Sequence, residues 1–154
     1  MQSDPVLAQV GEGIALHTSG DDEAARELFT RLWEEIGENG DPLHRMALAH
    51  SMADVVTDPH ESLRWDLRAF EAAAQVTDER LRAAGITTSI EAFYPSLHLN
   101  LGEAYRRVGD FGRAAEHLER GCAALVHLDD DASAPMFRDA LARLSERLRT
   151  ARAG

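Results

Sequence analysis

The sequence predicts an all-α protein, because its composition, hydrophobic periodicity and turn residues all favour helices. The 154 residues include 25 alanines and 18 leucines but only four isoleucines, and all 16 basic residues are arginines. Ala, Leu, Arg and Glu lose little conformational freedom in a helix. Apolar residues recur at helical spacing between short runs of Gly, Asp and Pro, and no stretch has the pattern of a strand ladder. A chain of this length is expected to form one domain.

Four helices are expected in the first half of the chain, at residues 6–18, 22–36, 43–56 and from 59 onward. Ser19-Gly20-Asp21 ends the first helix, and the Gly- and Asp-rich run before Pro42 ends the second. Asp58 can cap the fourth helix, since the following Pro59 suits a first helical position. This helix either continues through Thr77 to Ala84 or breaks and restarts there.

Three further helices are expected at residues 90–108, 111–128 and 134–152. Pro95 begins or kinks the first of them, because proline has no backbone N–H to donate. Gly109-Asp110 forms a tight turn before the second, and the acidic run at residues 129–131 links it to the last. The seven segments therefore form antiparallel pairs of helices with short connections.

Two segments of the chain share a motif at a constant offset of 89 residues. The first contains Gly13, Ala15, Leu16, Gly20, Asp21, Ala25 and Phe29, and the second contains Gly102, Ala104, Tyr105, Gly109, Asp110, Ala114 and Leu118. Small residues are needed where two helices approach closely, and the larger ones fill the space between them. Two 34-residue repeats would leave about 21 residues over, so the middle of the chain is expected to hold an enlarged repeat.

The motif resembles the tetratricopeptide repeat (TPR), with His98, Leu118 and Val126 where that repeat has Trp, Phe and Pro. The resemblance implies a right-handed α-α superhelix of about three TPR-like helix pairs in a single domain over residues 1–154. The repeats would cover about 6–39, 43–84 (degenerate and extended) and 90–128, followed by a capping helix at 134–152. Together with the lysine-free composition, it suggests a short, free-standing bacterial protein.

In TPR arrays the first helix of each pair lines a concave groove that binds a peptide or a partner helix. The resemblance implies that the groove residues here are Val10, Ile14, His17, Leu48, Ser51, Asp54, Ser96, Asn100, Glu103, Arg106 and Arg107. An apolar anchor would bury against Leu7, Val10 and Ile14, and the polar residues near Glu103 would orient it. The alternative is that Asn100, Glu103 and Arg107 form a solvated stripe with an intrahelical ion pair.

Two other functions are consistent with the sequence. His50 and Asp54 lie four residues apart on one expected helix, and with His98 they could hold a small molecule or a divalent metal ion. The competing interpretation is that His50 packs between helices with Asp54 as its hydrogen-bond partner. The array could also be a scaffold that binds only itself, as a homodimer.

The charge distribution excludes several classes of protein. The formal net charge is −11, which disfavours binding to nucleic acid or to an anionic membrane surface. Residues 1–41 carry a net −8 and residues 134–154 a net +3, a pattern that serves solubility or pairs with a charged partner. No apolar run is long enough to cross a bilayer, and no signal peptide is expected.

The sequence contains no pattern typical of an enzyme. It has no nucleophile elbow, phosphate-binding loop or dinucleotide fingerprint, so neither catalysis nor a cofactor is expected. The single cysteine, Cys122, is expected to be a buried, inert thiol on the helix that follows Gly109. A single thiol cannot form an intramolecular disulfide, and a cytoplasmic protein is therefore expected.

Overall fold

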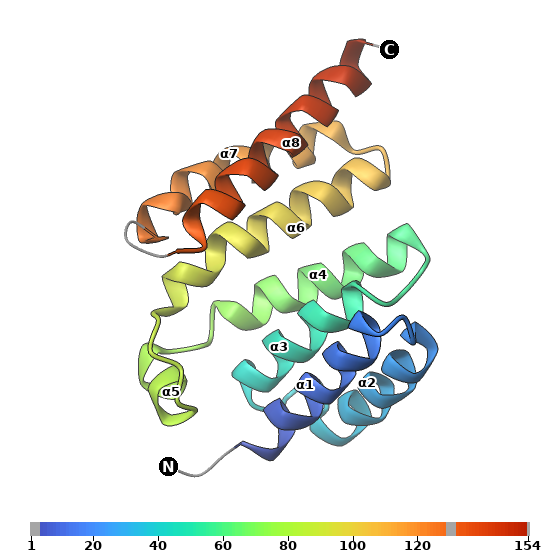
Figure 1. Cartoon of the computed structure of the whole chain (residues 1–154), viewed down its shortest axis with the longest axis vertical. Coiled ribbons are helices and arrows are strands. Elements are labelled where there is room, and N and C mark those ends of the chain that lie inside the picture. Colours follow the sequence, from blue (N-terminus) through green and yellow to red (C-terminus); the bar gives the residue numbers. More distant parts are fainter. Residues whose placement is uncertain (1–3, 129–131, 154) are drawn as a thin grey trace. The chain divides into compact units, whose positions relative to one another are not determined.

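The computed structural model describes residues 4–128 and 132–153, and every regular element within these ranges is helical (Figure 1). The all-α prediction is therefore confirmed. The chain divides into two compact units, Met1–Thr88 and Ser89–Gly154, which we call unit 1 and unit 2. A single superhelix built from both units stays a prediction.

Unit 1 consists of two antiparallel helix pairs and a short fifth helix. Its elements are α1 (Pro5–Thr18), α2 (Asp22–Ile36), α3 (Pro42–Ala53), α4 (Pro59–Ala73) and α5 (Asp78–Ala83). Helix α1 packs on α2, α3 packs on α4, and α3 also contacts both α1 and α2. The fourth expected helix breaks after Ala73 and restarts, because the Thr77 hydroxyl accepts a hydrogen bond from the Arg80 N–H and caps α5.

Unit 2 contains one helix pair and the C-terminal helix, which packs on both of its members. Its elements are the 3₁₀ turn η1 (Ile90–Phe93), α6 (Tyr94–Arg107), α7 (Phe111–Ala124), the 3₁₀ turn η2 (Leu125–Leu128) and α8 (Ala134–Ala153). The helix expected at 90–108 is split, since Pro95 occupies the first turn of α6 and the preceding turn is 3₁₀. The α-helix expected to reach residue 128 ends at Ala124 and continues as η2.

The turns α1–α2 and α6–α7 have the same geometry at the 89-residue offset. Gly20 has φ 90° and Gly109 has φ 85°, a left-handed conformation that suits glycine. The following N–H of Asp21 donates to the Leu16 carbonyl at 2.8 Å, and that of Asp110 donates to Tyr105 at 2.9 Å. Both aspartates then cap the next helix through a side-chain oxygen. The repeated Gly-Asp turn is confirmed.

The small residues of the motif lie where helices approach closely. A Cβ atom added to Gly13 would lie 2.1 Å from Cε1 of Phe29, which is fully buried. Ala25 and Ala114 have no exposed surface. A Cβ added to Gly102 would instead lie 2.7 Å from a methyl group of Leu144 on α8. The close packing is thus present in both units, with different partners.

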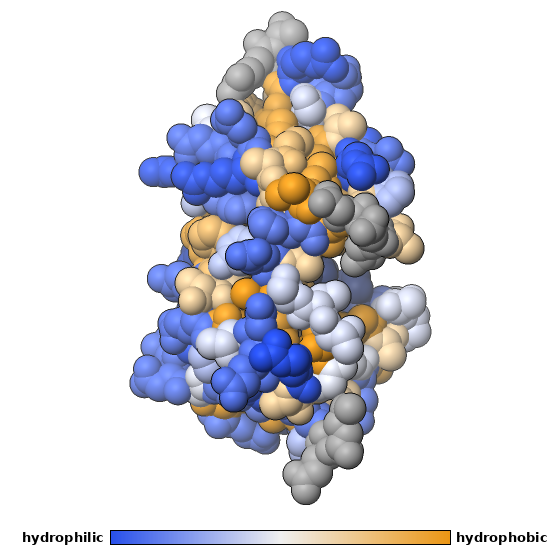
Figure 2. Space-filling view, turned by 90° about the vertical axis from the view of Figure 1, so that its left-hand side faces the viewer, coloured by the Kyte–Doolittle hydropathy of each residue, from blue (hydrophilic) through white to orange (hydrophobic). Residues whose placement is uncertain are grey.

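The face seen in Figure 2 mixes hydrophilic and hydrophobic residues. Within the described ranges, no helix combines the length and the apolar character that crossing a membrane would require. Cys122 is exposed, so the expectation of a buried thiol is wrong. The reason is its position on α7: the neighbouring Gly121 faces Leu141 of α8, whereas the next residue turns outward.

Candidate functional site

The residues that the TPR resemblance assigns to a groove in unit 1 differ widely in exposure. Val10 and Leu48 belong to the core, with 3% and 0% of their surface exposed, whereas Ile14 is 46% exposed. Ser51 is buried on α3 and Asp54, at its C-terminal end, is exposed. His17 lies on the surface, where its Nδ1 is 2.6 Å from an oxygen of Asp22. Of the three expected anchor residues, only Ile14 is fully at the surface, since Leu7 is half-buried.

The groove residues assigned to unit 2 all lie on α6, and one of them, Glu103, contacts a cluster of arginines. They are Ser96, Asn100, Glu103, Arg106 and Arg107. Glu103 accepts hydrogen bonds from Arg106, whose Nε is 3.1 Å from Oε1. The expected pair with Arg107 is longer, at 4.0 Å. The alternative of an intrahelical ion pair is therefore partly realised, but with Arg106 as the closer partner.

Helix α8 contributes one further arginine to this cluster. Arg147 donates from Nη1 to Oε2 of Glu103 at 3.3 Å, so the two oxygens of one carboxylate bind arginines from two helices. We call Glu103, Arg106, Arg107 and Arg147 the Glu103 cluster. Sequence reasoning missed Arg147, although the net positive charge of residues 134–154 was a signal that cations concentrate on this helix.

A shallow, open cleft of about 500 Å³ lies beside the Glu103 cluster, where Arg106 of α6 meets an exposed face of α8. It is lined by Arg106, Arg143, Glu146, Arg147, Thr150 and Ala151. Arg143 is exposed, and it forms no ion pair with any residue that the structure describes. Glu146 pairs with Arg149, one turn further along α8. Positive charge is therefore in excess around the cleft.

The carboxylate of Glu103 is held in its ionised form. Partial burial raises the pKa of Glu103, but the hydrogen bond from Arg106 and the charges of Arg106, Arg147 and Arg107 outweigh burial and lower the pKa. The same contact raises the pKa of Arg106. The cluster thus presents fixed charges at neutral pH.

The histidines proposed as metal ligands have other environments. His50 and Asp54 lie near each other on α3, where burial lowers the pKa of His50 and the Asp54 charge opposes that shift. His98, in unit 2, has its Nδ1 3.0 Å from Nδ1 of His117 on α7. Among the residues with described side chains, no three His, Cys, Asp or Glu are grouped to hold a metal ion. A site made of His50, Asp54 and His98 stays a prediction.

The buried pair His98–His117 was not expected from the sequence. The ring centroids are 5.3 Å apart, and Tyr94 and Tyr105 lie against the outer sides of the two rings at 5.9 and 5.5 Å. Burial, followed by the positive charges of His117 and Arg120, lowers the pKa of His98 to about 4. The signal that could have found the pair is the Gly109 turn, because residues at similar distances from a turn face each other in an antiparallel helix pair.

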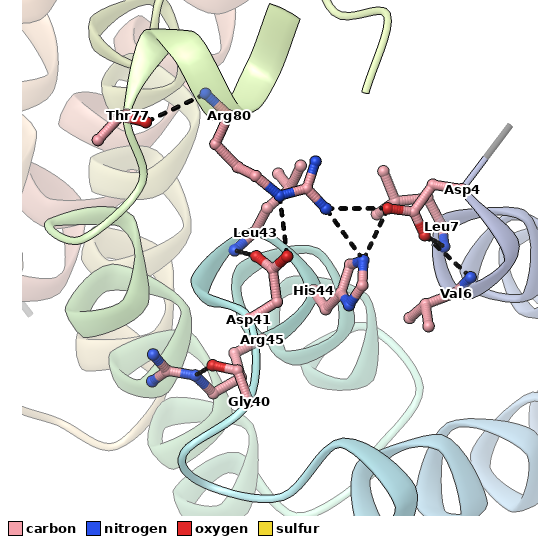
Figure 3. Close-up of polar contacts among 10 residues, drawn as sticks. All are labelled: Asp4, Val6, Leu7, Gly40, Asp41, Leu43, His44, Arg45, Thr77 and Arg80. Atoms are coloured by element: carbon pink, nitrogen blue, oxygen red, sulfur yellow. Dashed lines mark hydrogen bonds and ion pairs between the residues drawn. The ribbon is translucent and has the colours of Figure 1, made fainter. Parts of the chain in front are cut away.

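A second charged cluster lies in unit 1, where Arg80 of α5 connects the starts of α1 and α3 (Figure 3). Its Nη2 is 3.0 Å from Asp4 and its Nε is 2.8 Å from Asp41, and His44 Nε2 is 2.7 Å from the same oxygen of Asp4. The remaining oxygen of each aspartate caps its helix, through the N–H groups of Val6 and Leu7 or of Leu43. We call Asp4, Asp41, His44 and Arg80 the Arg80 cluster.

Both aspartates of the Arg80 cluster are strongly stabilised as anions. Burial raises the pKa of Asp4, but hydrogen bonds from His44, the Leu7 N–H and Arg80 lower it to about 2. In the same way, Arg80 and the Leu43 N–H lower the pKa of Asp41 against the effect of burial. Each acceptor oxygen is used and Arg80 is paired with two carboxylates, so this cluster has a structural role.

The two tryptophans of the chain pack against each other in unit 1. Trp33 on α2 and Trp65 on α4 meet edge to face with centroids 5.0 Å apart, and the Arg68 guanidinium lies 4.3 Å from the Trp65 ring centre. Trp65 is 8% exposed and forms part of the core. The ring contact and the Arg68 guanidinium therefore give Trp65 a packing role in the core.

Comparison with known proteins identifies no relative: no family model matches the chain, and neither does any curated protein or solved structure at a significant level. The TPR resemblance therefore depends on the motif residues alone.

Proposed function

We propose that this protein is a non-catalytic interaction module that binds a segment of a partner protein at the cleft between α6 and α8. The observation that carries the proposal is the cleft itself, where Arg106, Arg143 and Arg147 from two packed helices surround an open space of about 500 Å³. Guanidinium groups are frequent at protein interfaces, because they combine a planar set of donors with an apolar stem.

The composition of the cleft favours a protein segment as its ligand. Ala151 and the methyl group of Thr150 offer apolar surface beside the charged side chains. The TPR resemblance assigns Glu103 and Arg106 to a concave peptide groove. Arg106 lines the cleft and is paired with Glu103, so both arguments point to the same face of α6. The arginine-only, single-cysteine composition supports a bacterial cytoplasmic setting for the module.

The test is a selection of peptides from a displayed random library on the immobilised full chain. We expect the enriched peptides to bind the native chain and to lose at least tenfold in affinity for the double variant Arg143→Glu, Arg147→Glu, a change of about 1.4 kcal/mol or more. The matched control is Arg138→Glu, since Arg138 is exposed on the same helix but does not line the cleft. Enrichment of no peptide, or binding that is equal in all variants, would contradict the proposal.

A further inference from the structure

Glu103 shows how the arginines of unit 2 bind a carboxylate. Its Oε1 accepts from Arg106 and its Oε2 from Arg147, so one carboxylate bridges α6 and α8. Charge-assisted contacts of this kind are the stronger class of hydrogen bond, and guanidinium geometry matches carboxylate oxygens. Arg106 and Arg147 also line the cleft, so a second carboxylate placed there would meet the same donors.

The positions of the cleft arginines set a spacing for such a ligand. Arg143 and Arg147 are four residues apart on α8, which places them on one face and about 6 Å apart along the helix axis. Two acidic side chains one turn apart on a helix have that spacing, as do alternate residues of an extended segment, at about 6.8 Å.

The charge balance leaves room for added anions. Three arginines, at positions 106, 143 and 147, line the cleft against the one lining carboxylate of Glu146, and Glu103 lies beside them. Even with Glu103 counted, the cleft keeps a surplus of one positive charge, in a chain whose net charge is −11. Complementary charge at an interface selects partners and speeds their association.

We infer that the cleft binds an acidic segment of another protein through two carboxylates about 6 Å apart, and that Glu103 is an internal counter-ion that lowers its affinity. The inference rests on the proposed function and adds the chemistry of the partner. Because Glu103 occupies donors of Arg106 and Arg147 and repels a carboxylate beside them, the neutral variant Glu103→Gln binds the segment more tightly than the native chain does.

The test is a fluorescence-anisotropy titration of the full chain into a labelled alanine-based helical peptide that carries Glu at positions i and i+4. A second peptide carries Gln at both positions. We expect the Glu peptide to bind, the Gln peptide to bind at least tenfold more weakly, and Arg143→Gln with Arg147→Gln to remove most of the difference. Arg143 has no ion pair with a described residue, and Arg147 is more than half exposed and gives up only a surface ion pair, so this variant is expected to fold, as far-UV circular dichroism would verify.

The counter-ion role has its own readout. Glu103→Gln is expected to tighten binding of the Glu peptide about fivefold to tenfold, because it removes one repulsive charge beside the cleft whose effect is partly screened by solvent and salt. The matched control is Glu119→Gln, which removes the same charge from an exposed position on α7. A purely structural role for Glu103 predicts the opposite result, because loss of the bridge between α6 and α8 would loosen the cleft.

The outcomes separate the inference from the proposed function. Equal binding of the Glu and Gln peptides, or weaker binding by Glu103→Gln, would overturn the inference while the proposed function stands. Absence of binding by any displayed or synthetic peptide would overturn both. The remaining possible occupant of the cleft is a second copy of this chain, which sedimentation of the chain alone tests. A dimer that dissociates in the Arg143→Gln, Arg147→Gln variant would show a second copy in the cleft and would overturn the inference.

Discussion

The Arg80 cluster of unit 1 and the Glu103 cluster of unit 2 use the same residue types in opposite proportions. In unit 1 two carboxylates surround one arginine and one histidine, and each aspartate oxygen has a donor (Figure 3). In unit 2 one carboxylate is shared among three arginines, and Arg143 has no anionic partner within the described residues. A balanced cluster fixes helices in place, whereas an unbalanced one at an open cleft is suited to binding.

The motif glycines allow the sharpest comparison of the packing in the two units. Gly13→Ala is expected to destabilise unit 1 by about 3 kcal/mol, because the new methyl group collides with the buried ring of Phe29. Gly102→Ala collides with the end of the Leu144 side chain rather than with a rigid ring, and the better helix propensity of alanine offsets part of that contact, so we expect a smaller loss of about 1 kcal/mol. Urea denaturation followed by far-UV circular dichroism measures the stability of both variants. Equal losses would contradict the claim that Gly13 is packed against a less yielding neighbour than Gly102.

The balanced cluster should be costly to break. Arg80→Met is expected to destabilise unit 1 by about 2 kcal/mol, because it leaves Asp4 and Asp41 without their shared cation while the methionine keeps much of the packing. Tryptophan fluorescence reports unit 1 specifically, since both tryptophans of the chain lie there. Arg82→Met, at an exposed position on the same short helix, serves as the control and should change stability by less than about 0.5 kcal/mol.

Acid should affect unit 2 through its histidine pair. The pKa of His98 is lowered to about 4 in the folded chain, so the unfolded chain takes up a proton first as the pH falls below about 6.5. The contribution of His98 to stability is therefore fully present above pH 6.5 and declines between pH 6.5 and 4, by up to about 3 kcal/mol. Urea titrations at pH 7 and 4.5 should show a smaller decline for His98→Gln than for the native chain.

The control for this pH effect is His60→Gln, at an exposed position in the first turn of α4. It should retain the full decline between pH 7 and 4.5. A native-like decline in His98→Gln would mean that other groups cause the acid sensitivity.

The unbalanced cluster should contribute least to stability. Glu103→Gln is expected to cost about 0.5 kcal/mol, because the released Arg107 and Arg147 are already more than half exposed and regain water. The same urea titration tests this value. A loss as large as that of Arg80→Met would indicate that the Glu103 cluster is structural, contrary to the comparison.

Local features were the ones that sequence reasoning predicted well. The Gly20 and Gly109 turns follow from residues within a few positions, since only glycine readily adopts their positive φ and the next aspartate caps the helix. The break after Ala73 could not be decided in advance, because Ala72, Ala73 and Ala74 favour a continuous helix. There the structure depends on Arg80, whose partner Asp4 is 76 residues away.

The part of the candidate site on α6 could be predicted from the sequence because it depends on local spacing, whereas the part on α8 could not. Helical spacing placed Asn100, Glu103 and Arg107 on one face of α6. No local pattern shows that Arg147, 44 residues later, meets Glu103, because that contact depends on how α8 packs against α6.

The central claim, that positive charge in the α6–α8 cleft is available to a ligand while that of Arg80 is not, can be tested in one experiment. Side-chain Nε–H signals of ¹⁵N-labelled arginines would be followed by NMR while the Glu-bearing helical peptide is added. The account predicts that Arg143, Arg147 and Arg106 shift and that Arg80 does not. Shifts of Arg80 equal to those of the cleft arginines, or no shift at any of the four, would contradict it.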